Sequence, residues 1–395
     1  MDNFSKMLKT ANVYAKNDPL CQPIYQTSVF KMPSYEEAVR CENANQPTDY
    51  YTRWGNPTIS FLEKQLTNIS GYEKCLIFPS GMSAITTTLL SLVKANDVIL
   101  ASNRLYGDTL KFFIEELPRF GIKVLFFDIN NIEDILKNFS PSKENKTFIY
   151  FETLSNPDLV IADIIKIKEV STKINAVTIS DATFTPPGNL SIHLPDFVDV
   201  VIHSLTKYIS GHFSSFGGAI LSPHKIAKKI WHTQTLYGNC VDPHASWLIS
   251  QGVKTLHLRL EQQNKSALAI AKHLELNPKI KSVQYPLLKS NPQFQLAEKL
   301  FKNGGGVISF SLKEGQGSAI QLIQNTNLVG LFVSLGGLHS CIEHAESMSH
   351  SMVTQDHKKV SQIDHAPDDL IRLSIGVEKT KDIIDDLDQA LEKLV

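Results

Sequence analysis

The sequence has little of what marks several classes of protein. Its 39 basic and 40 acidic side chains nearly cancel, without a long run of one sign, so we expect no electrostatic surface for nucleic acid or an anionic membrane. No apolar run approaches the roughly 18 residues of a membrane span. The first residues also lack a basic segment followed by an apolar block. We therefore expect a cytoplasmic protein with a small-molecule substrate, and neither a nucleic-acid nor a membrane partner.

Cysteine is also scarce and unpatterned. The five cysteines, Cys21, Cys41, Cys75, Cys240 and Cys341, are odd in number and widely spaced, and no two form a Cys-x-x-Cys pair. This argues against a disulfide framework and a thiolate zinc site, and it fits a reducing compartment. Hydrophobic residues make up 42% of the chain and charged residues 20%, as in ordinary soluble globular proteins.

The order of apolar runs predicts an α/β protein. With 395 residues, the chain exceeds the usual size of one hydrophobic core, so two packed units are expected. Short apolar runs alternate with stretches of helical period, which indicates a mainly parallel sheet. The predicted strands are 74–78, 97–102, 123–127, 147–152, 176–180 and 199–204. Ligands bind beyond the carboxyl ends of such strands, so the residues that follow them are the candidates for a site.

The chain is expected to divide into three parts. Residues 1–58 are polar, contain several prolines and show little periodicity, so we expect an extended arm that reaches a neighbouring subunit. Residues 59–250 form the predicted large domain. Residues 251–395 form a predicted smaller α+β domain, with strands near 304–312 and 370–375. The sequence predicts a long helical segment over residues 225–275.

The strongest local signal is HSLTKYISGH, residues 203–212. Lys207 lies just beyond a predicted strand, with Ser204 and Thr206 before it. A lysine amine whose pKa is lowered there can attack an aldehyde and hold it as a Schiff base, and the two hydroxyls suit a phosphate. A surface lysine that happens to follow a strand is the alternative.

Three further features follow other predicted strands. Asp181 in SDATFTPP is a candidate partner for a protonated pyridine nitrogen, although it could also cap a turn. Gly81 and Met82 begin a predicted helix, whose N-terminal amides suit a phosphate. Tyr106 offers a ring for stacking and a hydroxyl for proton transfer, although an ordinary packed tyrosine is the alternative. Their order along successive strand ends favours one common site.

The chain resembles the cysteine and methionine metabolism family of pyridoxal-phosphate (PLP) enzymes, which contains cystathionine lyases and synthases and methionine γ-lyase. The resemblance extends over nearly the whole chain. It rests on PIYQTSVF (23–30), YTRWGNPT (51–58), SGM (80–82), YGDT (106–109), ETLSNP (152–157), SDATF (180–184), HSLTKYISGH (203–212), SLGG (334–337) and IRLSIGVE (371–378).

This resemblance implies a PLP-dependent transferase fold of type I, similar to aspartate aminotransferase, and pyridoxal 5'-phosphate as the cofactor. It implies that Tyr51 and Arg53 reach the phosphate of a neighbouring subunit's cofactor in a homotetramer, a dimer of dimers with shared active sites. Arg372 would grip the substrate carboxylate with help from Ser334. Asn156 would lie near the phenolic oxygen of the cofactor. Thr183 belongs to the same cofactor-binding set, and Tyr51 and His339 to the substrate-binding set.

The expected activity is that of a carbon-sulfur lyase acting on cystathionine or a related sulfur amino acid. Lys207 would remove the α-proton, and Tyr106 would act as acid and base near the leaving group. The sequence does not separate β- from γ-elimination. The alternative within the family is γ-replacement, as in cystathionine γ-synthase or O-acylhomoserine sulfhydrylase.

Several residues depart from the common family pattern where the distal end of the substrate is held. They are Tyr50, Asp108, Lys111, which replaces a frequent arginine, and His339, which replaces a frequent glutamate. Ala182 and Ser214 also differ, with small structural consequences expected.

Two functions from other classes are the remaining alternatives. His339, Glu343, His344 and His350 could form a metal site of a hydrolase, but they lack the H-E-x-x-H spacing. A catalytically inactive binding protein is the other. The retained lysine, acid and tyrosine argue against it.

Overall fold

The computed structural model describes residues 2–12, 19–351, 353–361 and 367–394. The chain divides into two compact units, each built from two separate segments. The first unit contains Met1–Lys94 and His193–Leu256, and the second contains Ala95–Ile192 and His257–Val395. The three sequence-based parts, 1–58, 59–250 and 251–395, stay predictions.

The first unit contains three strands in the order β1-β7-β6, and β7 is antiparallel to both neighbours. The strands are β1 (Lys74–Phe78), β6 (Val200–Ser204) and β7 (Gly218–Ser222). The helices are α1 (Asn3–Leu8), α2 (Tyr35–Glu42), α3 (Pro57–Ser70), α4 (Gly81–Leu92), α8 (His224–Tyr237) and the first part of α9 (Pro243–Leu276), together with the short helix η4 (Leu194–Asp196).

Two segments of this unit differ from the sequence-based expectation. The segment expected to be extended contains α1 and α2, because Asp2 and Ser34 accept hydrogen bonds from the first amides of these helices and so cap them. The helical stretch at 225–275 is two helices. Gly238 ends α8 in the left-handed conformation, with φ 75°, and Pro243 begins α9, as expected for these residues at helix ends.

The second unit contains four strands in the order β5-β4-β2-β3, all parallel. They are β2 (Val98–Ser102), β3 (Lys123–Phe127), β4 (Thr147–Glu152) and β5 (Val177–Asp181). The accompanying helices are α5 (Gly107–Lys111), the π-helix η1 (Phe112–Glu116), η2 (Leu117–Phe120), η3 (Ile129–Asn131), α6 (Asp134–Asn138) and α7 (Ile164–Lys173). The parallel arrangement places Ser102, Glu152 and Asp181 at the same edge of these strands.

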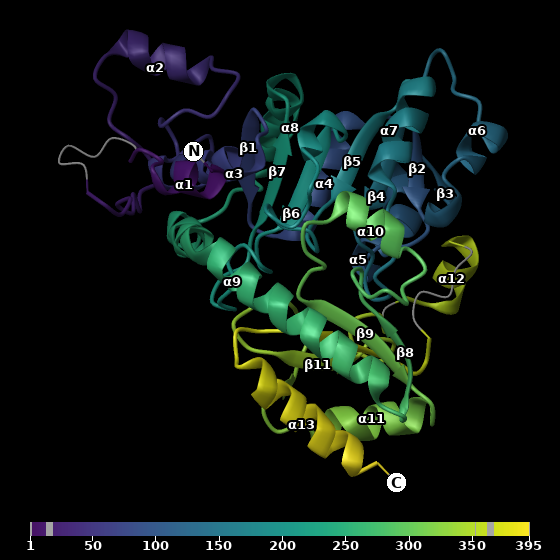
Figure 1. Ribbon diagram of the computed structural model, residues 1–395. Helices are drawn as coiled ribbons and strands as arrows, with labels where there is room; N and C mark the ends of the chain where they lie inside the picture. Colours follow the sequence, from purple (N-terminus) through teal and green to yellow (C-terminus); the bar gives the residue numbers. More distant parts are fainter. Residues whose placement is uncertain (1, 13–18, 352, 362–366, 395) are drawn as a thin grey trace. The chain divides into compact units, whose positions relative to one another are not determined.

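The second unit also holds a five-stranded sheet in the order β10-β11-β12-β9-β8. Its strands are β8 (Ile280–Gln284), β9 (Val307–Leu312), β10 (Gly330–Leu331), β11 (Cys341–His344) and β12 (Leu370–Ser374), and its helices are α10 (Phe294–Leu300), α11 (Gln316–Asn325), α12 (Gln355–Ser361) and α13 (Thr380–Glu392). Figure 1 shows α11 and α13 side by side. Their apolar faces join the second part of α9 and the sheet in one buried core.

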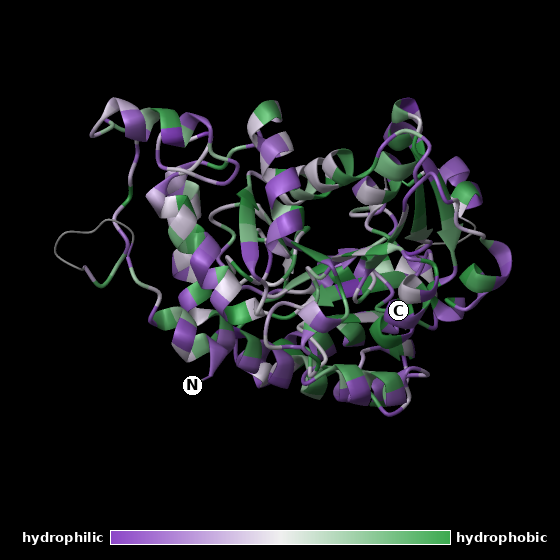
Figure 2. Ribbon diagram, turned by 90° about the horizontal axis from the view of Figure 1, so that it is seen from above, coloured by the Kyte–Doolittle hydropathy of each residue, from purple (hydrophilic) through white to green (hydrophobic). Residues whose placement is uncertain are grey.

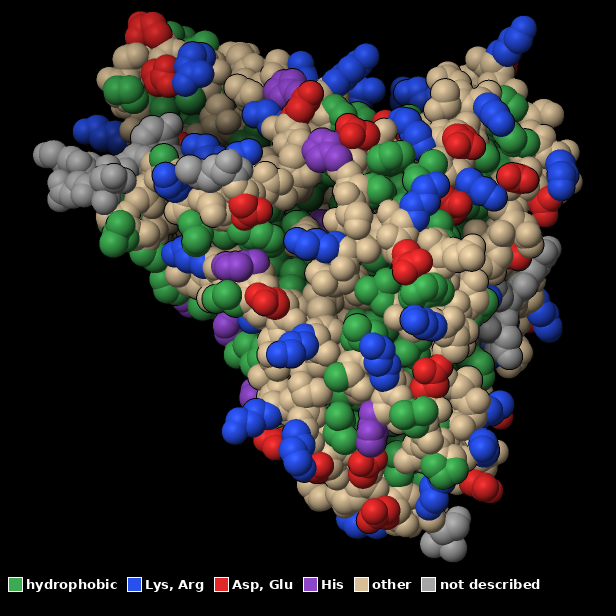
Figure 3. Space-filling model, viewed as in Figure 1, with side chains coloured by type: hydrophobic (Ala, Val, Ile, Leu, Met, Phe, Trp, Pro, Cys, Tyr) green, Lys and Arg blue, Asp and Glu red, His purple; other side chains and the backbone are tan. Residues whose placement is uncertain are grey.

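Hydrophobic and charged residues are distributed as expected for packed layers. In Figure 2 the strands are predominantly hydrophobic, whereas many helices alternate between hydrophobic and hydrophilic residues. On the face drawn in Figure 3, acidic and basic side chains are interspersed. Among the described residues, none of the helices combines the length and apolar character needed to cross a membrane.

Candidate active site

The start of α4 is a tight turn against the end of β6 in the first unit. A Cβ added to Gly81 would lie 3.0 Å from the Ser204 Cβ and 3.2 Å from its Oγ, so a larger residue would require a small shift of the neighbouring segment. Ser80 caps the helix by accepting a hydrogen bond from the Ser83 amide at 3.0 Å. The Ser83 hydroxyl is buried without a hydrogen-bond partner among the described residues. This cradle of helix amides, including those of Gly81 and Met82, and small hydroxyls has the character of a phosphate site.

Lys207 lies in the turn that follows β6. Its amide donates to the Ser204 carbonyl at 3.3 Å, and its carbonyl accepts from Gly211 at 2.8 Å. The Thr206 hydroxyl accepts from the Gly217 amide at 3.2 Å, which ties this turn to the start of β7. The first unit therefore brings Gly81, Ser204, Thr206 and Lys207 close together, and their roles toward phosphate and aldehyde stay predictions.

Tyr51 and Arg53 lie in an exposed loop of the first unit. The Arg53 guanidinium lies 5.3 Å from the centre of the Tyr51 ring and donates to the Thr235 carbonyl at 2.8 Å. The loop is tight, because a Cβ on Gly55 would lie 2.6 Å from the Thr48 carbonyl oxygen. Both side chains are thus held at the surface of their own unit.

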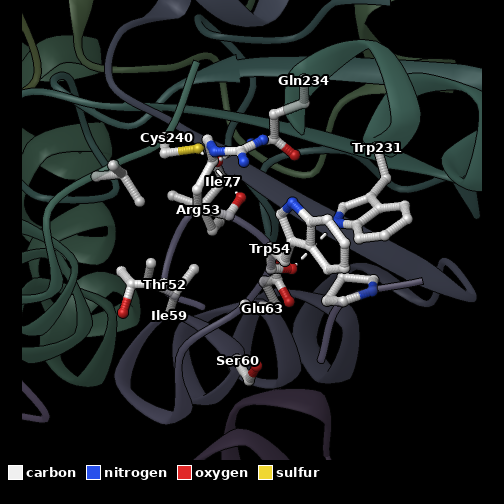
Figure 4. Close-up of a pocket in the computed structure, with 13 residues that line it drawn as sticks. Thr52, Arg53, Trp54, Ile59, Ser60, Glu63, Ile77, Trp231, Gln234 and Cys240 are labelled. Carbon is white, nitrogen blue, oxygen red and sulfur yellow. Dashed lines mark hydrogen bonds between the residues drawn. The ribbon is translucent and has the colours of Figure 1, made fainter. Parts of the chain in front are cut away.

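Residues that line a pocket next to this loop hold it in place (Figure 4). Trp54 meets Trp231 edge to face with ring centres 6.4 Å apart, and the Trp231 Nε1–H donates to the Trp54 carbonyl at 3.1 Å. The Cys240 thiol donates to the Arg53 carbonyl at 3.2 Å. These contacts come from α8 and the segment that follows it, and they hold the backbone carbonyls of Arg53 and Trp54.

In the second unit, two carboxyl groups lie next to each other at the strand ends. Glu152 and Asp181 are register partners on the parallel strands β4 and β5. Asp181 accepts a hydrogen bond from the Thr183 amide at 2.9 Å, and Glu152 accepts one from the Tyr106 amide at 2.6 Å. Burial, and then the charge of Asp181, raises the pKa of Glu152 well above its usual range. The environment of Glu152 therefore favours the neutral form of its carboxyl group.

Arg372 is the centre of a second buried cluster in this unit. It is only 3% exposed. Its Nη1 donates to Asn156 Oδ1 at 2.9 Å, its Nη2 donates to the Ser334 carbonyl at 2.8 Å, and its Nη2 lies 3.0 Å from Glu343 Oε1.

Two atoms of this cluster are buried without a hydrogen-bond partner among the described residues: Arg372 Nε and Glu343 Oε2. Buried polar groups normally have partners, so these two indicate a place for a polar ligand. Ser334 has a φ of 100°, a strained conformation for a non-glycine residue of the kind that recurs at functional sites. A carboxylate is the ligand that best matches an unsatisfied guanidinium.

The Tyr106 hydroxyl donates to Asp108 Oδ2 at 2.9 Å. Burial raises the pKa of Tyr106, and its hydrogen bond to Asp108 raises it further, whereas the charge of Arg372 lowers it. Tyr106 is therefore protonated at neutral pH and can donate a proton. His339, which the sequence placed among the substrate residues, lies exposed in the loop before β11.

The residues of the alternative metal site are engaged otherwise. The His344 ring nitrogens lie 2.8 Å from the Ser347 hydroxyl and 2.7 Å from the Asp368 carbonyl. His350 Nε2 lies 3.1 Å from the Asn156 carbonyl, and burial, followed by the charge of Arg372, lowers its pKa to about 4. Among the described residues, no three His, Cys, Asp or Glu side chains form a group that could hold a metal ion.

The sequence analysis missed two residues of these clusters. Glu152 stands at the end of β4, beside Asp181, and this position could have identified it as a site residue. Glu343 had been considered only as a metal ligand, because its pairing with Arg372 depends on the register of β11 and β12, which is not visible in the sequence.

Comparisons with known proteins identify the family to which the chain is similar. Residues 7–392 match the model of the family described as Cys/Met metabolism PLP-dependent enzymes. L-methionine γ-lyase of Fusobacterium nucleatum is 37% identical over 378 residues, which cover 95% of this chain and 94% of that protein. Cystathionine β-lyase of Lactococcus lactis is 35% identical, with 94% and 93% covered.

A solved structure from Campylobacter jejuni, described as an O-acetylhomoserine (thiol)-lyase, has a TM-score of 0.91 at 30% identity and covers 100% of both chains. That structure contains a pyridoxyl-lysine monophosphate. The α/β fold of type I and the PLP cofactor expected from the sequence are thereby confirmed. The chain belongs to the Cys/Met metabolism family of PLP-dependent enzymes.

Proposed function

We propose that this chain is a PLP-dependent carbon-sulfur lyase that acts on L-cystathionine or a related sulfur amino acid. The observation that carries the proposal is the buried Arg372, whose Nε has no partner among the described residues and which is therefore ready for an amino-acid carboxylate. Relatives that are lyases of methionine and of cystathionine support the substrate class.

Each cluster has a distinct task in this proposal. The cradle of Gly81, Met82, Ser204 and Thr206 would hold the cofactor phosphate, and Lys207 would hold its aldehyde carbon until a substrate amine takes that place. Asp181 would keep a proton on the pyridine nitrogen, and the Thr183 amide orients the Asp181 carboxylate. When bound, PLP supplies a cationic ring that takes up the electrons released from the amino acid.

The chain's own residues then move the protons. Arg372, Ser334 and Asn156 bind and orient the substrate carboxylate, and the Lys207 amine removes the α-hydrogen as a base. As the carbon-sulfur bond breaks, the electron pair goes to sulfur, and the Tyr106 hydroxyl gives sulfur a proton. Glu152 holds the backbone of Tyr106, and so fixes the ring that carries this hydroxyl.

Assembly into a homotetramer with shared sites is part of the proposal. Tyr51 and Arg53 are exposed on their own unit, as needed for side chains that reach a neighbour's phosphate. Large apolar side chains are also exposed, among them Leu20, Tyr35 and Leu236, and burial between subunits would remove them from water. Light scattering should give the mass of four chains. We infer a cytoplasmic location from the sequence features.

Product analysis with the purified holoenzyme tests the activity. From L-cystathionine, pyruvate with homocysteine identifies β-elimination, and 2-oxobutyrate with cysteine identifies γ-elimination. The similarity to an O-acetylhomoserine (thiol)-lyase keeps γ-replacement as the second candidate. If no keto acid forms from any sulfur amino acid, but an acylhomoserine plus a thiol yields a thioether, the lyase assignment is wrong. No turnover of either kind would favour an inactive binding protein.

A further inference from the structure

Asp108 is a charged residue beside Tyr106. The proposed mechanism gives Asp108 no role. It lies in the first turn of α5 and is exposed. Its Oδ2 accepts the Tyr106 hydroxyl hydrogen at 2.9 Å. The group proposed to protonate the leaving sulfur is thus hydrogen-bonded to a carboxylate that faces solvent.

The backbone beside this carboxylate is packed closely, and its side chain is held by a hydrogen bond. A Cβ added to the preceding residue, Gly107, would lie 3.3 Å from Val353 Cγ2, so the start of α5 is pressed against the segment that contains Val353. The hydrogen bond to Tyr106, whose amide is held by Glu152, fixes the other side. A carboxylate held in this way binds a ligand without a large cost of ordering.

The charge of Asp108 is not neutralised within its own unit. The nearest basic residue on α5 is Lys111, and its ammonium lies 4.0 Å from Glu115, at the limit of an ion pair. No ion pair of Asp108 occurs among the described residues of this unit. A carboxylate accepts several hydrogen bonds, so the bond from Tyr106 leaves capacity for a cation.

We propose that Asp108 is a specificity-determining residue that binds the ammonium group of the leaving thiol, and so favours cystathionine over methionine. This inference rests on the proposed lyase function. The leaving group of cystathionine carries an ammonium, and the methanethiol of methionine carries no charge. A carboxylate beside the leaving sulfur attracts the ammonium of the cystathionine-derived thiol. Methanethiol would remove water from the same carboxylate and offer no charge or hydrogen bond in return.

The test compares kcat/KM for L-cystathionine and L-methionine in wild type, Asp108→Asn and Asp108→Ser holoenzymes. Asparagine keeps the shape and the hydrogen bond to Tyr106 but removes the charge. We expect kcat/KM for cystathionine to fall by about 10-fold or more, the size of a charge-assisted hydrogen bond. For methionine it should change by less than about 3-fold. Asp134→Asn, at an exposed aspartate paired with Lys137, is the matched control and should leave both values unchanged.

The outcomes separate this inference from the function on which it rests. Equal losses for both substrates, an unchanged ratio, or a wild type that prefers methionine would overturn the role of Asp108 while leaving the lyase intact. A wild type that cleaves neither substrate would overturn both. If Asp108→Asn does not fold, as judged by its melting curve, the same ratio measured with Asp108→Ser decides.

Discussion

The candidate site residues of the two units differ in their physical character. In the first unit, the cradle around Gly81 and Ser204 is built from backbone amides, small hydroxyls and a glycine whose added Cβ would make a tight contact with Ser204. In the second unit, Asp181, Glu152, Arg372 and Glu343 are ionisable groups, and the last three are buried. The cradle should therefore be sensitive to added volume, and the second unit to changes of charge.

The largest effect is expected from removal of the buried cation. Arg372→Leu should lower kcat/KM by about 10³-fold or more, because it removes the guanidinium that binds the substrate carboxylate. It also leaves Glu343 as a buried unpaired charge, which should cost about 3–5 kcal/mol of unfolding free energy. Urea unfolding and steady-state kinetics measure the two effects.

The double variant Arg372→Leu/Glu343→Gln separates them. It should recover most of the stability but none of the activity. Activity in the double variant would contradict the assignment of Arg372 to the substrate.

An added methyl group tests the cradle of the first unit. Gly81→Ala should weaken binding of PLP by about 10-fold, since its Cβ would meet Ser204 at 3.0 Å and such overpacking costs about 1–3 kcal/mol. At saturating PLP, kcat should change little. Gly317→Ala is the matched control, because no atom lies within 4 Å of its added Cβ. Equal PLP affinity in both variants would show that the Gly81 turn does not contact the cofactor.

A smaller effect is expected at Glu152. Burial and the charge of Asp181 raise the pKa of Glu152, which favours the neutral side chain. Glu152→Gln should therefore keep kcat/KM within about 3-fold, with the amide oxygen accepting the Tyr106 N–H. Glu152→Ala should lose that bond and about 1–3 kcal/mol of stability. A Gln variant that loses activity 100-fold while Ala loses no more would mean that the ionised carboxylate is needed.

The smallest effect concerns pH. Burial raises the pKa of Tyr106, and the hydrogen bond and the charge of Asp108 raise it further, so removal of that charge in Asp108→Asn should lower this pKa. Tyr106 acts as an acid in its protonated form, and activity is lost as pH rises through its pKa. The alkaline limb of the methionine profile should therefore move to lower pH in the variant. A limb that stays in place would exclude Tyr106 as the titrating acid.

The sequence was most informative where local pattern determines structure. The strands β1, β3 and β4 have the predicted bounds, because their apolar runs are flanked by polar residues or turns. Strand β7, GAILS, was not predicted, since its short run follows glycines and its antiparallel pairing with β1 and β6 joins segments far apart in the chain. The break between α8 and α9 was missed although Gly238 and Pro243 mark it.

The same contrast holds for the site. Lys207, Asp181 and Gly81 are predicted from the sequence because each lies at the end of a strand or within three residues of it. The pairing of Arg372 with Glu343, and the hydrogen bond between Tyr106 and Asp108, depend on register and side-chain direction. Neither could be read from spacing alone.

The central claim is that Lys207 carries the cofactor. Borohydride treatment of the yellow holoenzyme makes the bond between the lysine and PLP permanent, and peptide mapping by mass spectrometry then locates it. We predict one pyridoxyl group per chain, on the peptide that contains Lys207, and none in Lys207→Ala. A pyridoxyl label on another lysine would contradict this account. So would a borohydride-treated enzyme that carries no label and retains full activity.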